Sequence, residues 1–370
     1  MKIKIINEKC EVNCFFCKNL SNTVKLEIVD APLVLGVSLK EKNKDKFVSY
    51  NVFRCNSCGL IFTNVCLDSE AYSEIHSEAI GSLWLEHHTT FSEFIKSQIK
   101  KNSKILEIGP SNNPLFRGNT VFIDMFEKSP FILQKNESYL KGQFPNLNMN
   151  QKFDVIVASH VFEHATNPHK FLEKCLKLLT DEGQIFFSIP NFLYWINQKY
   201  WNGITAEHQI YPTEYQIIKI CSQINLFPSF EYFYNHSIFI KISKKNELTK
   251  KVEKEIDIIQ WGNSIKSSVL EVEQILNDKK IDEIFVTGAS HLSQYPILMS
   301  KEIERKVRFV LDNSKRKHEK RVYGTEKICK PFDVLKDLEN PYVVLFNSPY
   351  RNEMIEQINS INDSAHIISV

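Results

Sequence analysis

The sequence has no excess of either charge. Its 46 Lys and Arg residues face 44 Asp and Glu residues, which leaves a formal net charge of +2. Proteins that bind nucleic acids or anionic membranes usually carry a basic surplus on one face. The balance therefore gives no reason to expect nucleic acid or a membrane surface as the main partner.

Long apolar runs are missing as well. The opening MKIKIINEKC has no extended apolar stretch behind its Lys residues, and no later run reaches the roughly 18 apolar residues of a membrane span. We therefore expect a cytoplasmic protein with no membrane partner. At 370 residues the chain exceeds one ordinary core, so two or three domains are expected.

Glycine is scarce, with 11 residues in the chain, and the scarcity matters at one turn. KILEIGPSNNP reads as a strand entering a tight turn that has a single glycine, Gly109, while Ser111 and Asn113 stand where nucleotide-binding turns usually have more. The pyrophosphate of NAD requires such glycines more than S-adenosylmethionine does, since the latter has no phosphate. Asn113 also tolerates left-handed backbone geometry. The turn thus counts against NAD more than against S-adenosylmethionine.

Cysteine, in contrast, is concentrated near the N-terminus, where six of nine residues fall within the first 66. Two Cys-x-x-Cys pairs, CFFC and CNSC, have the spacing of zinc knuckles, and Gly59 supplies the positive φ that a knuckle often needs. In a reducing compartment, metal is favoured over disulfides or a redox pair. We predict a structural zinc site of four thiolates, Cys14, Cys17, Cys55 and Cys58, with Cys10 and Cys66 as bystanders.

From residue 104 onward, short apolar runs alternate with helical patterns. KILEIG, TVFIDM, FDVIVASH and GQIFFSIP read as strands, and an amphipathic helix is predicted between the last two. This alternation predicts a doubly wound, mostly parallel sheet, in which ligands bind beyond the carboxyl ends of the strands. Asp124 ends the second strand, where a carboxylate can accept both hydroxyl groups of a ribose.

The whole pattern predicts an α/β chain in three parts. A zinc-binding module is expected at residues 1–68, and a Rossmann-like domain at 69–243, of which 69–103 form leading helices. Residues 244–370 are expected to form a smaller Rossmann-like α/β domain that begins with a linker of paired helices. Asp312 and Lys315, in a charged loop of this last part, could face a diphosphate, although such a loop is more often only a charged surface.

The segments ILEIG…FIDM and FDVIVASHVFEHATNP…GQIFFSIPN together resemble class I S-adenosylmethionine-dependent methyltransferases. The resemblance implies that the turn holds the methionine part of the cofactor, that the acid after the second strand holds the ribose, and that the end of the next strand faces the methyl group. These roles fall on Glu107, Gly109, Ser111, Asp124, Ser159 and His160, with Asn113 in the same turn.

The layout of the whole chain is similar to a narrower family, the sugar-nucleotide C-methyltransferases. The matching pieces are CEVNCFFC…APLVLG…FRCNSCGL, LWLEHH, EIGPSNNPLF, AEHQIYP and FVTGASHLSQYPIL…FVLDNSKRKHEKRVYG. The resemblance implies methylation of a carbon beside a ketone in a nucleotide-activated sugar. Its Glu-His pair falls on Glu207 and His208. His208 is the candidate base because histidine titrates near neutral pH, and Tyr211 is a candidate donor to the enolate oxygen.

Several alternatives remain open at this stage. The acceptor could instead be a hydroxyl or amine on another small molecule or glycan precursor, or the fold could be a degenerate binding protein. A nucleic-acid methyltransferase is disfavoured by the charge balance. His164 either lies at the mouth of the active site or caps the helix that begins near Pro168. Of His87 and His88, at least one is expected to be exposed.

Overall fold

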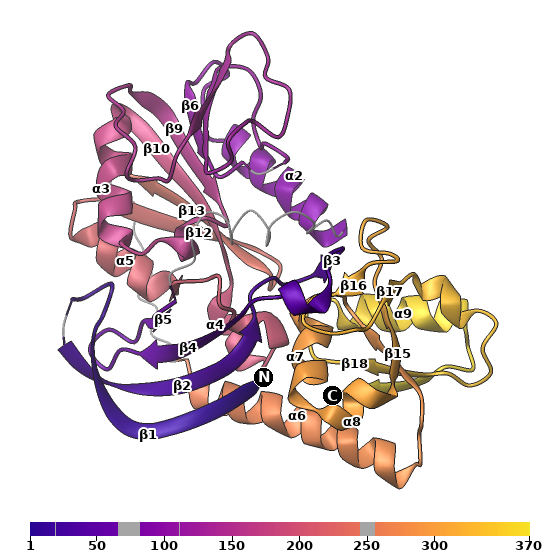
Figure 1. Cartoon of the computed structure of the whole chain (residues 1–370). Coiled ribbons are helices and arrows are strands. Elements are labelled where there is room, and N and C mark those ends of the chain that lie inside the picture. The colour runs from indigo at the N-terminus through magenta and orange to yellow at the C-terminus, as the bar shows by residue number, and fades with distance from the viewer. Residues whose placement is uncertain (19, 66–81, 111, 245–255) are drawn as a thin grey trace.

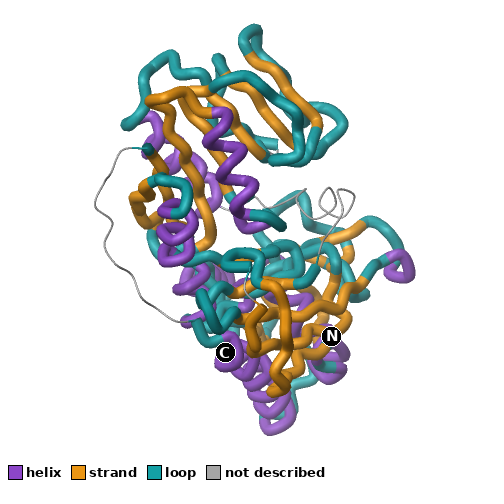
Figure 2. Tube along the Cα trace, turned by 90° about the vertical axis from the view of Figure 1, so that its left-hand side faces the viewer, coloured by secondary structure: helices purple, strands orange, loops and turns teal. Residues whose placement is uncertain are grey.

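The computed structural model describes residues 1–18, 20–65, 82–110, 112–244 and 256–370. Within these residues the chain forms three main sheets and one two-stranded pair. In Figure 1 the central sheet lies at the top, the N-terminal sheet at lower left and the C-terminal sheet at right. Figure 2, turned by 90°, shows the central sheet as an upper lobe and the other two sheets together as a lower lobe.

The N-terminal sheet is antiparallel, in the order β1-β2-β4-β5-β11. Its first four strands are β1 (Lys2–Asn13), β2 (Leu20–Pro32), β4 (Phe47–Arg54) and β5 (Ile61–Thr63), with the 3-10 helix η1 (Lys42–Lys44) before β4. The last strand, β11 (Ile210–Tyr211), comes from the middle of the chain. The N-terminal part is therefore completed by residues more than 140 positions away, such as Gln209, whose carbonyl accepts the N–H of Thr63.

The central sheet has seven strands in the order β12-β13-β10-β9-β6-β7-β8. The five that run from β10 to β8 are parallel, β13 is antiparallel to them, and β12, which is antiparallel to β13, runs in the same direction as the five. Their bounds are β6 (Ile105–Ile108), β7 (Thr120–Asp124), β8 (Glu137–Lys141), β9 (Phe153–Ser159), β10 (Leu179–Pro190), β12 (Phe227–Phe233) and β13 (Ser237–Ser243). All four strands predicted for this region form, and β6 is buried throughout because helices cover both faces.

The helices of this part are α2 (Ser82–Lys96), α3 (Pro168–Leu178), α4 (Phe192–Asn197) and α5 (Glu214–Ser222), with 3-10 turns η2 (Phe162–His164) and η3 (Trp201–Gly203). Helix α3 starts where Asn167 accepts the N–H of Lys170, with Pro168 in the first turn. It ends earlier than the sequence predicts, because TDEG belongs to β10. The front part of the predicted leading helices lies outside the described residues.

The C-terminal sheet is wholly parallel, in the order β17-β15-β14-β18-β19. Its strands are β14 (Ile284–Thr287), β15 (Val307–Leu311), β17 (Cys329–Lys330), β18 (Tyr342–Leu345) and β19 (His366–Ser369). The associated helices are α6 (Ile258–Asp278), α7 (His291–Met299), α8 (Lys301–Lys306), η4 (Phe332–Leu335) and α9 (Arg351–Ile361). The sequence pattern of LSQYPILMSKEIE predicts one helix, but the segment forms two, because the hydroxyl of Ser300 accepts the N–H of Ile303 and begins α8.

The described part of the predicted helix pair is the single helix α6, which packs between the N-terminal and C-terminal sheets in one continuous core. Gly262 permits a close approach, because a Cβ there would fall 3.2 Å from two side-chain carbons of Leu26. None of the helices within the described ranges is long and apolar enough to cross a bilayer.

The N-terminal and C-terminal parts are also joined directly. Strand β3 (Val37–Ser38) pairs with β16 (Arg321–Val322). Beside this pair, two guanidinium nitrogens of Arg321 contact the two carboxylate oxygens of the buried Asp45 at 2.6 and 2.8 Å. A bidentate pair in a buried place fixes orientation as well as distance, so the two parts have a defined relative position.

Candidate active site

A cavity of about 730 Å³ lies where the three parts meet. The central part contributes the carboxyl ends of β6, β7 and β9, as the parallel topology predicts. The N-terminal part contributes residues 34–37, and the C-terminal part contributes Ser290, His291, Arg316, Lys317 and Tyr350. All three parts of the chain thus contribute to the wall. The cavity is large enough for more than one small molecule.

The turn after β6 is shaped by Gly109, which has a φ of 67° and lines the cavity. Its N–H donates to the carbonyl of Ile123 at 2.8 Å, which ties the turn to the end of β7. A Cβ at this position would lie 2.6 Å from Cγ2 of Val161. The single glycine therefore stands at the place where close approach is required. Asn113 also lines the cavity, and Ser111 lies outside the described residues.

Glu107 shapes the same turn from beneath. It is buried, and its two carboxylate oxygens accept the N–H groups of Leu115 at 2.8 Å and Phe116 at 3.2 Å. Burial raises the pKa of Glu107 to about 8 despite these hydrogen bonds. Both oxygens accept backbone N–H groups, so Glu107 holds the loop in shape, and it also lines the cavity where the sequence predicts the cofactor.

Asp124 ends β7 and lies on the cavity wall. Its Oδ1 accepts the N–H of Met125 at 2.7 Å, which orients the carboxylate. Ser159 and His160, at the end of β9, also line the cavity. The hydroxyl of Ser159 is buried and makes no hydrogen bond to the described part of the chain. An orphaned polar group of this kind, beside a tight turn and an acid, fits a site built for a polar ligand.

Glu207 and His208 lie together on the cavity wall, beside the residues that follow β9. The Nε2 atom of His208 is 3.7 Å from Oε1 of Glu207, and His164 Nδ1 lies 2.8 Å from the Glu207 carbonyl. The rings of His164 and His208 are 5.0 Å apart. His164 therefore belongs to the cavity wall, while Asn167 caps the following helix.

The N-terminal sheet holds His208 in this place. Thr63, in β5, donates its hydroxyl to the carbonyl of His208 at 2.9 Å, and its N–H donates to Gln209 at 3.0 Å. Gln209 in turn donates its N–H to the carbonyl of Glu163 at 2.9 Å. The backbone on both sides of His208 is thus fixed by β5 and by η2.

Tyr211 does not serve as the sequence predicted. Its hydroxyl donates to the carbonyl of Thr205 at 2.7 Å and accepts the N–H of the same residue at 3.0 Å. It is fully buried and is not among the described residues that line the cavity. Its hydroxyl is used to close the loop before β11, and it has no donor left for an enolate.

The sequence interpretation missed Glu163. This carboxyl is completely buried, lines the cavity and makes no hydrogen bond through either oxygen within the described residues, although Oε1 lies 3.4 Å from Nδ1 of His160. Burial raises its pKa well above the ordinary value. A carboxylate oxygen of Glu163 and one ring nitrogen each of His164 and His208 lie within 4.8 Å of one another. Because Glu163 also faces His160 and His208 also faces Glu207, we describe the group as an acid–base cluster.

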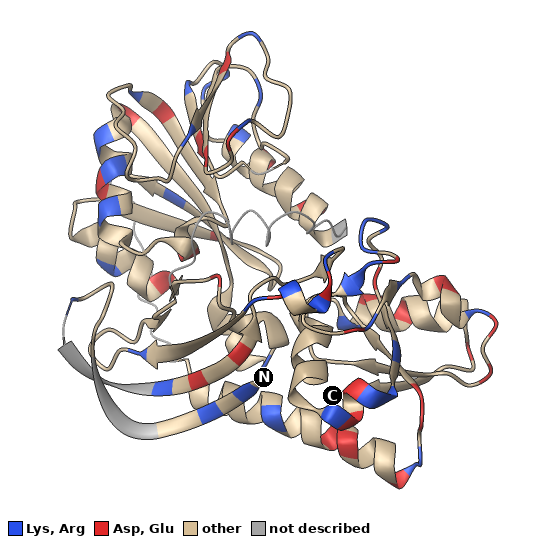
Figure 3. Cartoon of the chain, viewed as in Figure 1, with Lys and Arg blue, Asp and Glu red and all other residues tan. Residues whose placement is uncertain are grey.

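Two further expectations are corrected here. His87 is completely buried and His88 is half-buried on the cavity wall, so neither is solvent-exposed. In the loop after β15, the cavity is lined by Arg316 and Lys317, one position on from the predicted Lys315. Asp312 pairs with Lys317 at 3.0 Å behind the wall. In Figure 3, Lys and Arg are interspersed with Asp and Glu over the elements in view.

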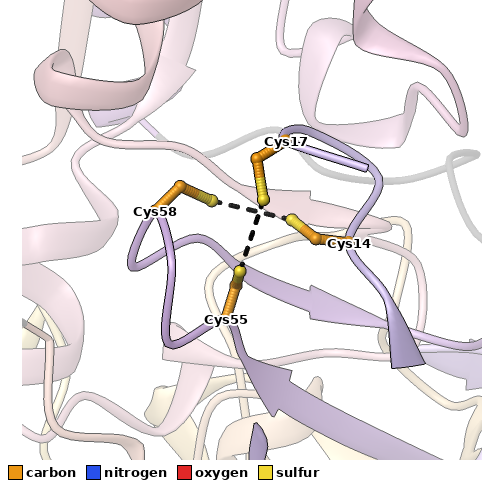
Figure 4. A group of neighbouring side chains, drawn as sticks. All are labelled: Cys14, Cys17, Cys55 and Cys58. Atoms are coloured by element: carbon orange, nitrogen blue, oxygen red, sulfur yellow. Dashed lines mark hydrogen bonds between the residues drawn. The ribbon is translucent and has the colours of Figure 1, made fainter. Parts of the chain in front are cut away.

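The four predicted cysteines converge at the end of the N-terminal sheet (Figure 4). The Sγ atoms of Cys14 and Cys58 are 3.6 Å apart, as are those of Cys17 and Cys55. A zinc ion bound by four thiolates holds its sulfurs about 3.8 Å apart, so the donor set fits that metal. A hydrogen bond with Cys58 lowers the pKa of Cys14 to about 5. Gly59 has a φ of 71°, which confirms the predicted geometry.

Comparison with known proteins shows that the central part of the chain matches a methyltransferase domain. Residues 82–226 match the family model described as "Methyltransferase domain". A 41-residue stretch is 42% identical to ubiquinone biosynthesis O-methyltransferase of Glaesserella parasuis serovar 5 (strain SH0165). That stretch is 11% of this chain and 17% of the relative, so the chain spans about a sixth of the length of the curated relative it matches. The prediction of a methyltransferase is confirmed for the matched domain.

Solved structures show low sequence identity to this chain. The plantazolicin methyltransferase BpumL in complex with SAH is 15% identical, with 45% of this chain and 84% of that chain covered and a TM-score of 0.35. The N-methyltransferase NodS from Bradyrhizobium japonicum WM9 is 14% identical, with 44% and 96% covered and a TM-score of 0.34. PH0226 from Pyrococcus horikoshii OT3 is 12% identical, with 48% and 100% covered and a TM-score of 0.38.

Proposed function

We propose, from the S-adenosylmethionine-dependent methyltransferase domain that residues 82–226 form, that the chain transfers a methyl group to a nucleotide-activated sugar, at a carbon beside a ketone. The observation that carries the proposal is the cavity itself. A methyl-donor turn, a Glu-His pair and a basic loop of the C-terminal part face one space of about 730 Å³. Each wall matches one component of such a reaction.

The donor wall is the end of the parallel sheet. In this proposal Asp124 accepts the ribose hydroxyls and the turn at Gly109 borders the amino-acid tail, since both residues line the cavity. When bound, S-adenosylmethionine supplies an electrophilic methyl group on a sulfonium, which is transferred by in-line displacement. The main task of the protein is therefore to position the acceptor and to remove its proton.

The acceptor wall carries the base. Removal of a proton beside a ketone requires a group with a pKa near neutrality, and His208 faces both the carboxylate of Glu207 and the ring of His164. Glu207 stabilises the imidazolium that forms. This assignment also explains why Thr63 and Gln209 hold the backbone on both sides of His208.

The third wall suits a diphosphate. Arg316, Lys317 and Tyr350 line the cavity beside the base, and the first two are cationic. Arginine and lysine are the usual partners of phosphate oxygens. In a sugar nucleotide the diphosphate lies between the sugar and the nucleoside, so a basic loop on the same cavity supports this acceptor class. We also propose that the Cys14, Cys17, Cys55 and Cys58 site holds structural zinc.

A second candidate, O-methylation of another small molecule, is favoured by one observation. The relative that matches over 41 residues is named as an O-methyltransferase. Proton removal from a hydroxyl would use the same His208, so the base does not separate the two candidates.

The proposal is tested first by calorimetric titration with S-adenosylhomocysteine, with NAD as control. Binding of the former that is lost in Asp124→Ala supports the donor site. Radiolabelled methyl transfer is then measured with 4-keto and 3-keto sugar nucleotides and with the same sugars lacking the nucleotide. Labelling of a nucleotide-ketosugar on carbon, lost in His208→Ala while cofactor binding is kept, is the expected result. Transfer to oxygen alone, or none to any nucleotide sugar, would reject the proposed acceptor.

A further inference from the structure

Along the cavity wall, polar side chains form a continuous series, in which four members line the cavity and Ser237 lies behind them. It begins at Glu163, whose Oε1 is 3.4 Å from Nδ1 of His160. The other ring nitrogen of His160 lies 3.0 Å from the hydroxyl oxygen of Ser237. The same hydroxyl lies 2.7 Å from Nδ1 of His236, whose Nε2 is 3.5 Å from the hydroxyl of Tyr350.

The series starts next to the base. A carboxylate oxygen of Glu163 lies within 4.8 Å of a ring nitrogen of His208, a separation that one water molecule can bridge. It ends at Tyr350, which is half-buried at the start of α9 and belongs to the C-terminal part. The series therefore crosses from one lobe to the other.

Each member has the chemistry that proton transfer requires. Imidazole rings accept a proton on one nitrogen and release another from the second, and a serine hydroxyl donates and accepts at once. Ser237 and Glu163 are completely buried and His236 is 5% exposed, which limits competition from water at these three members. The left-handed backbone of His160, with a φ of 52°, directs its ring between Glu163 and Ser237.

The pKa values of the series also favour transfer of a proton over its retention on one member. Burial raises the pKa of Glu163, which favours its protonated form, and burial lowers the pKa of His160 and brings that of His236 to about 4. The groups that face these side chains are the neutral rings of Trp84 and His87, together with His164 and His208. A proton that enters the series is not held on either histidine.

We propose that Glu163, His160, Ser237, His236 and Tyr350 form a proton-transfer path that carries the proton taken up by His208 along the cavity wall to the C-terminal part. The path rests on the proposed function. In each turnover the acceptor C–H bond breaks, its electron pair forms the new bond to the methyl carbon, and the sulfonium leaves as a neutral thioether. Glu163, protonated at rest, gives its proton to His160 as it takes the proton of His208. Each later member gives up one proton as it takes one, and the half-buried Tyr350 hydroxyl releases its own to solvent water, so that His208 is neutral again.

The chain provides a matched pair of serines to test the path. Ser237 lies within it, while Ser188 is equally buried on the neighbouring strand and contacts a histidine outside it, with 2.7 Å between its hydroxyl and Nε2 of His87. Neither serine lines the cavity. In Ser237→Ala we expect kcat to fall about tenfold or more, a larger solvent deuterium isotope effect on kcat, and KM and S-adenosylhomocysteine affinity within twofold of wild type. Ser188→Ala should change none of these.

A second measurement needs no acceptor, and it separates failure of the path from failure of the proposed function. Imidazole 15N spectra of the resting protein should show the ring of His236 responding to Glu163→Gln, but not when Ser237→Ala is also present. If no acceptor is ever methylated and this coupling is seen, the proposed function fails and the path stands as a hydrogen-bonded unit. Equal losses of kcat in the two serine variants, or no response of His236 to Glu163→Gln, would overturn the path.

Discussion

The central and C-terminal sheets contain the same turn, used in two ways. In each, a glycine with positive φ follows the first strand, and its N–H donates to the residue that precedes an aspartate. Gly109 donates to Ile123 at 2.8 Å, before Asp124, and Gly288 donates to Leu311 at 2.7 Å, before Asp312. The backbone framework for a ligand is therefore present twice in the chain.

The two aspartates differ in what they contact. Asp312 accepts the N–H groups of Ala289 and Ser314 and pairs with Lys317, and it is not among the described residues of the cavity wall. Asp124 lies on that wall. The comparison teaches that the turn alone does not make a binding site. Asp124 also accepts an N–H of its own loop, from Met125, so what differs is whether the acid reaches the cavity wall.

The residues two positions before the two glycines also differ. Glu107 lies two residues before Gly109 and binds the loop that follows, while Val286 lies two residues before Gly288 and is a buried apolar residue. In the central part, the carboxylate of Glu107 therefore fixes the loop that follows Gly109. The C-terminal turn has no acid at the matching position.

The largest effect is expected from a change in the N-terminal part. It tests whether the active site of the central part depends on the four-cysteine site. Gln216 donates to the carbonyl of Cys58, and Thr63 donates to the carbonyl of His208, so the thiolate centre supports the acceptor wall. In Cys58→Ser we expect zinc content to fall and methyl transfer to drop about 100-fold or more, since small misplacement of the base is costly. Metal analysis and turnover measure this. Affinity for S-adenosylhomocysteine kept within about fivefold is the control, and full turnover without metal would contradict the prediction.

Next in size is the effect of a side chain at each glycine. Gly109→Ala places a Cβ 2.6 Å from Val161 in a backbone region that disfavours it, so affinity for S-adenosylhomocysteine should fall at least about 30-fold. Gly288→Ala places a Cβ 2.9 Å from Leu292 and should lower stability by about 1–3 kcal/mol with affinity unchanged. Calorimetry and thermal unfolding of both variants separate the two turns. Equal loss of affinity in both would show that the C-terminal turn also serves the donor site.

The acids themselves should give a smaller separation. Asp124→Asn removes a charged acceptor of two hydroxyl groups, and we expect affinity for S-adenosylhomocysteine to fall about 10- to 100-fold. Asp312→Asn should leave that affinity within twofold, because Asp312 contacts its own loop. The measurement is titration calorimetry at one pH and salt concentration. The prediction is wrong if the two variants bind alike.

The smallest effect on binding is expected at Glu107. Its pKa in the folded chain, about 8, is above the ordinary value, so the folded state binds the extra proton. The contribution of this group to stability is therefore full below about pH 4.5 and is lost as the pH rises toward 8. Glu107→Gln should flatten this decline in melting temperature and change affinity for S-adenosylhomocysteine by less than about threefold. An unchanged pH profile would show that Glu107 does not titrate in this range.

The sequence predicted best where spacing along the chain decides structure. Cys14, Cys17, Cys55 and Cys58 converge because each knuckle is local, and the four central strands follow from apolar runs. It predicted less where distant contacts decide. Glu163 stands next to His164 in the sequence, yet its burial depends on packing that no local pattern records. Tyr211 was placed in the active site because it is near His208, but its hydroxyl closes a loop with Thr205.

The ion pair between Asp45 and Arg321 has a consequence for how the chain is made. The two residues are 276 positions apart, so at about 5–20 residues per second the ribosome completes Arg321 roughly 14 to 55 s after Asp45. During that interval the carboxylate of Asp45 has no guanidinium to enter the interior with, and β3 has no β16 beside it. The N-terminal sheet also waits for β11, its last strand. The first part of the chain to be synthesised is therefore among the last to be finished.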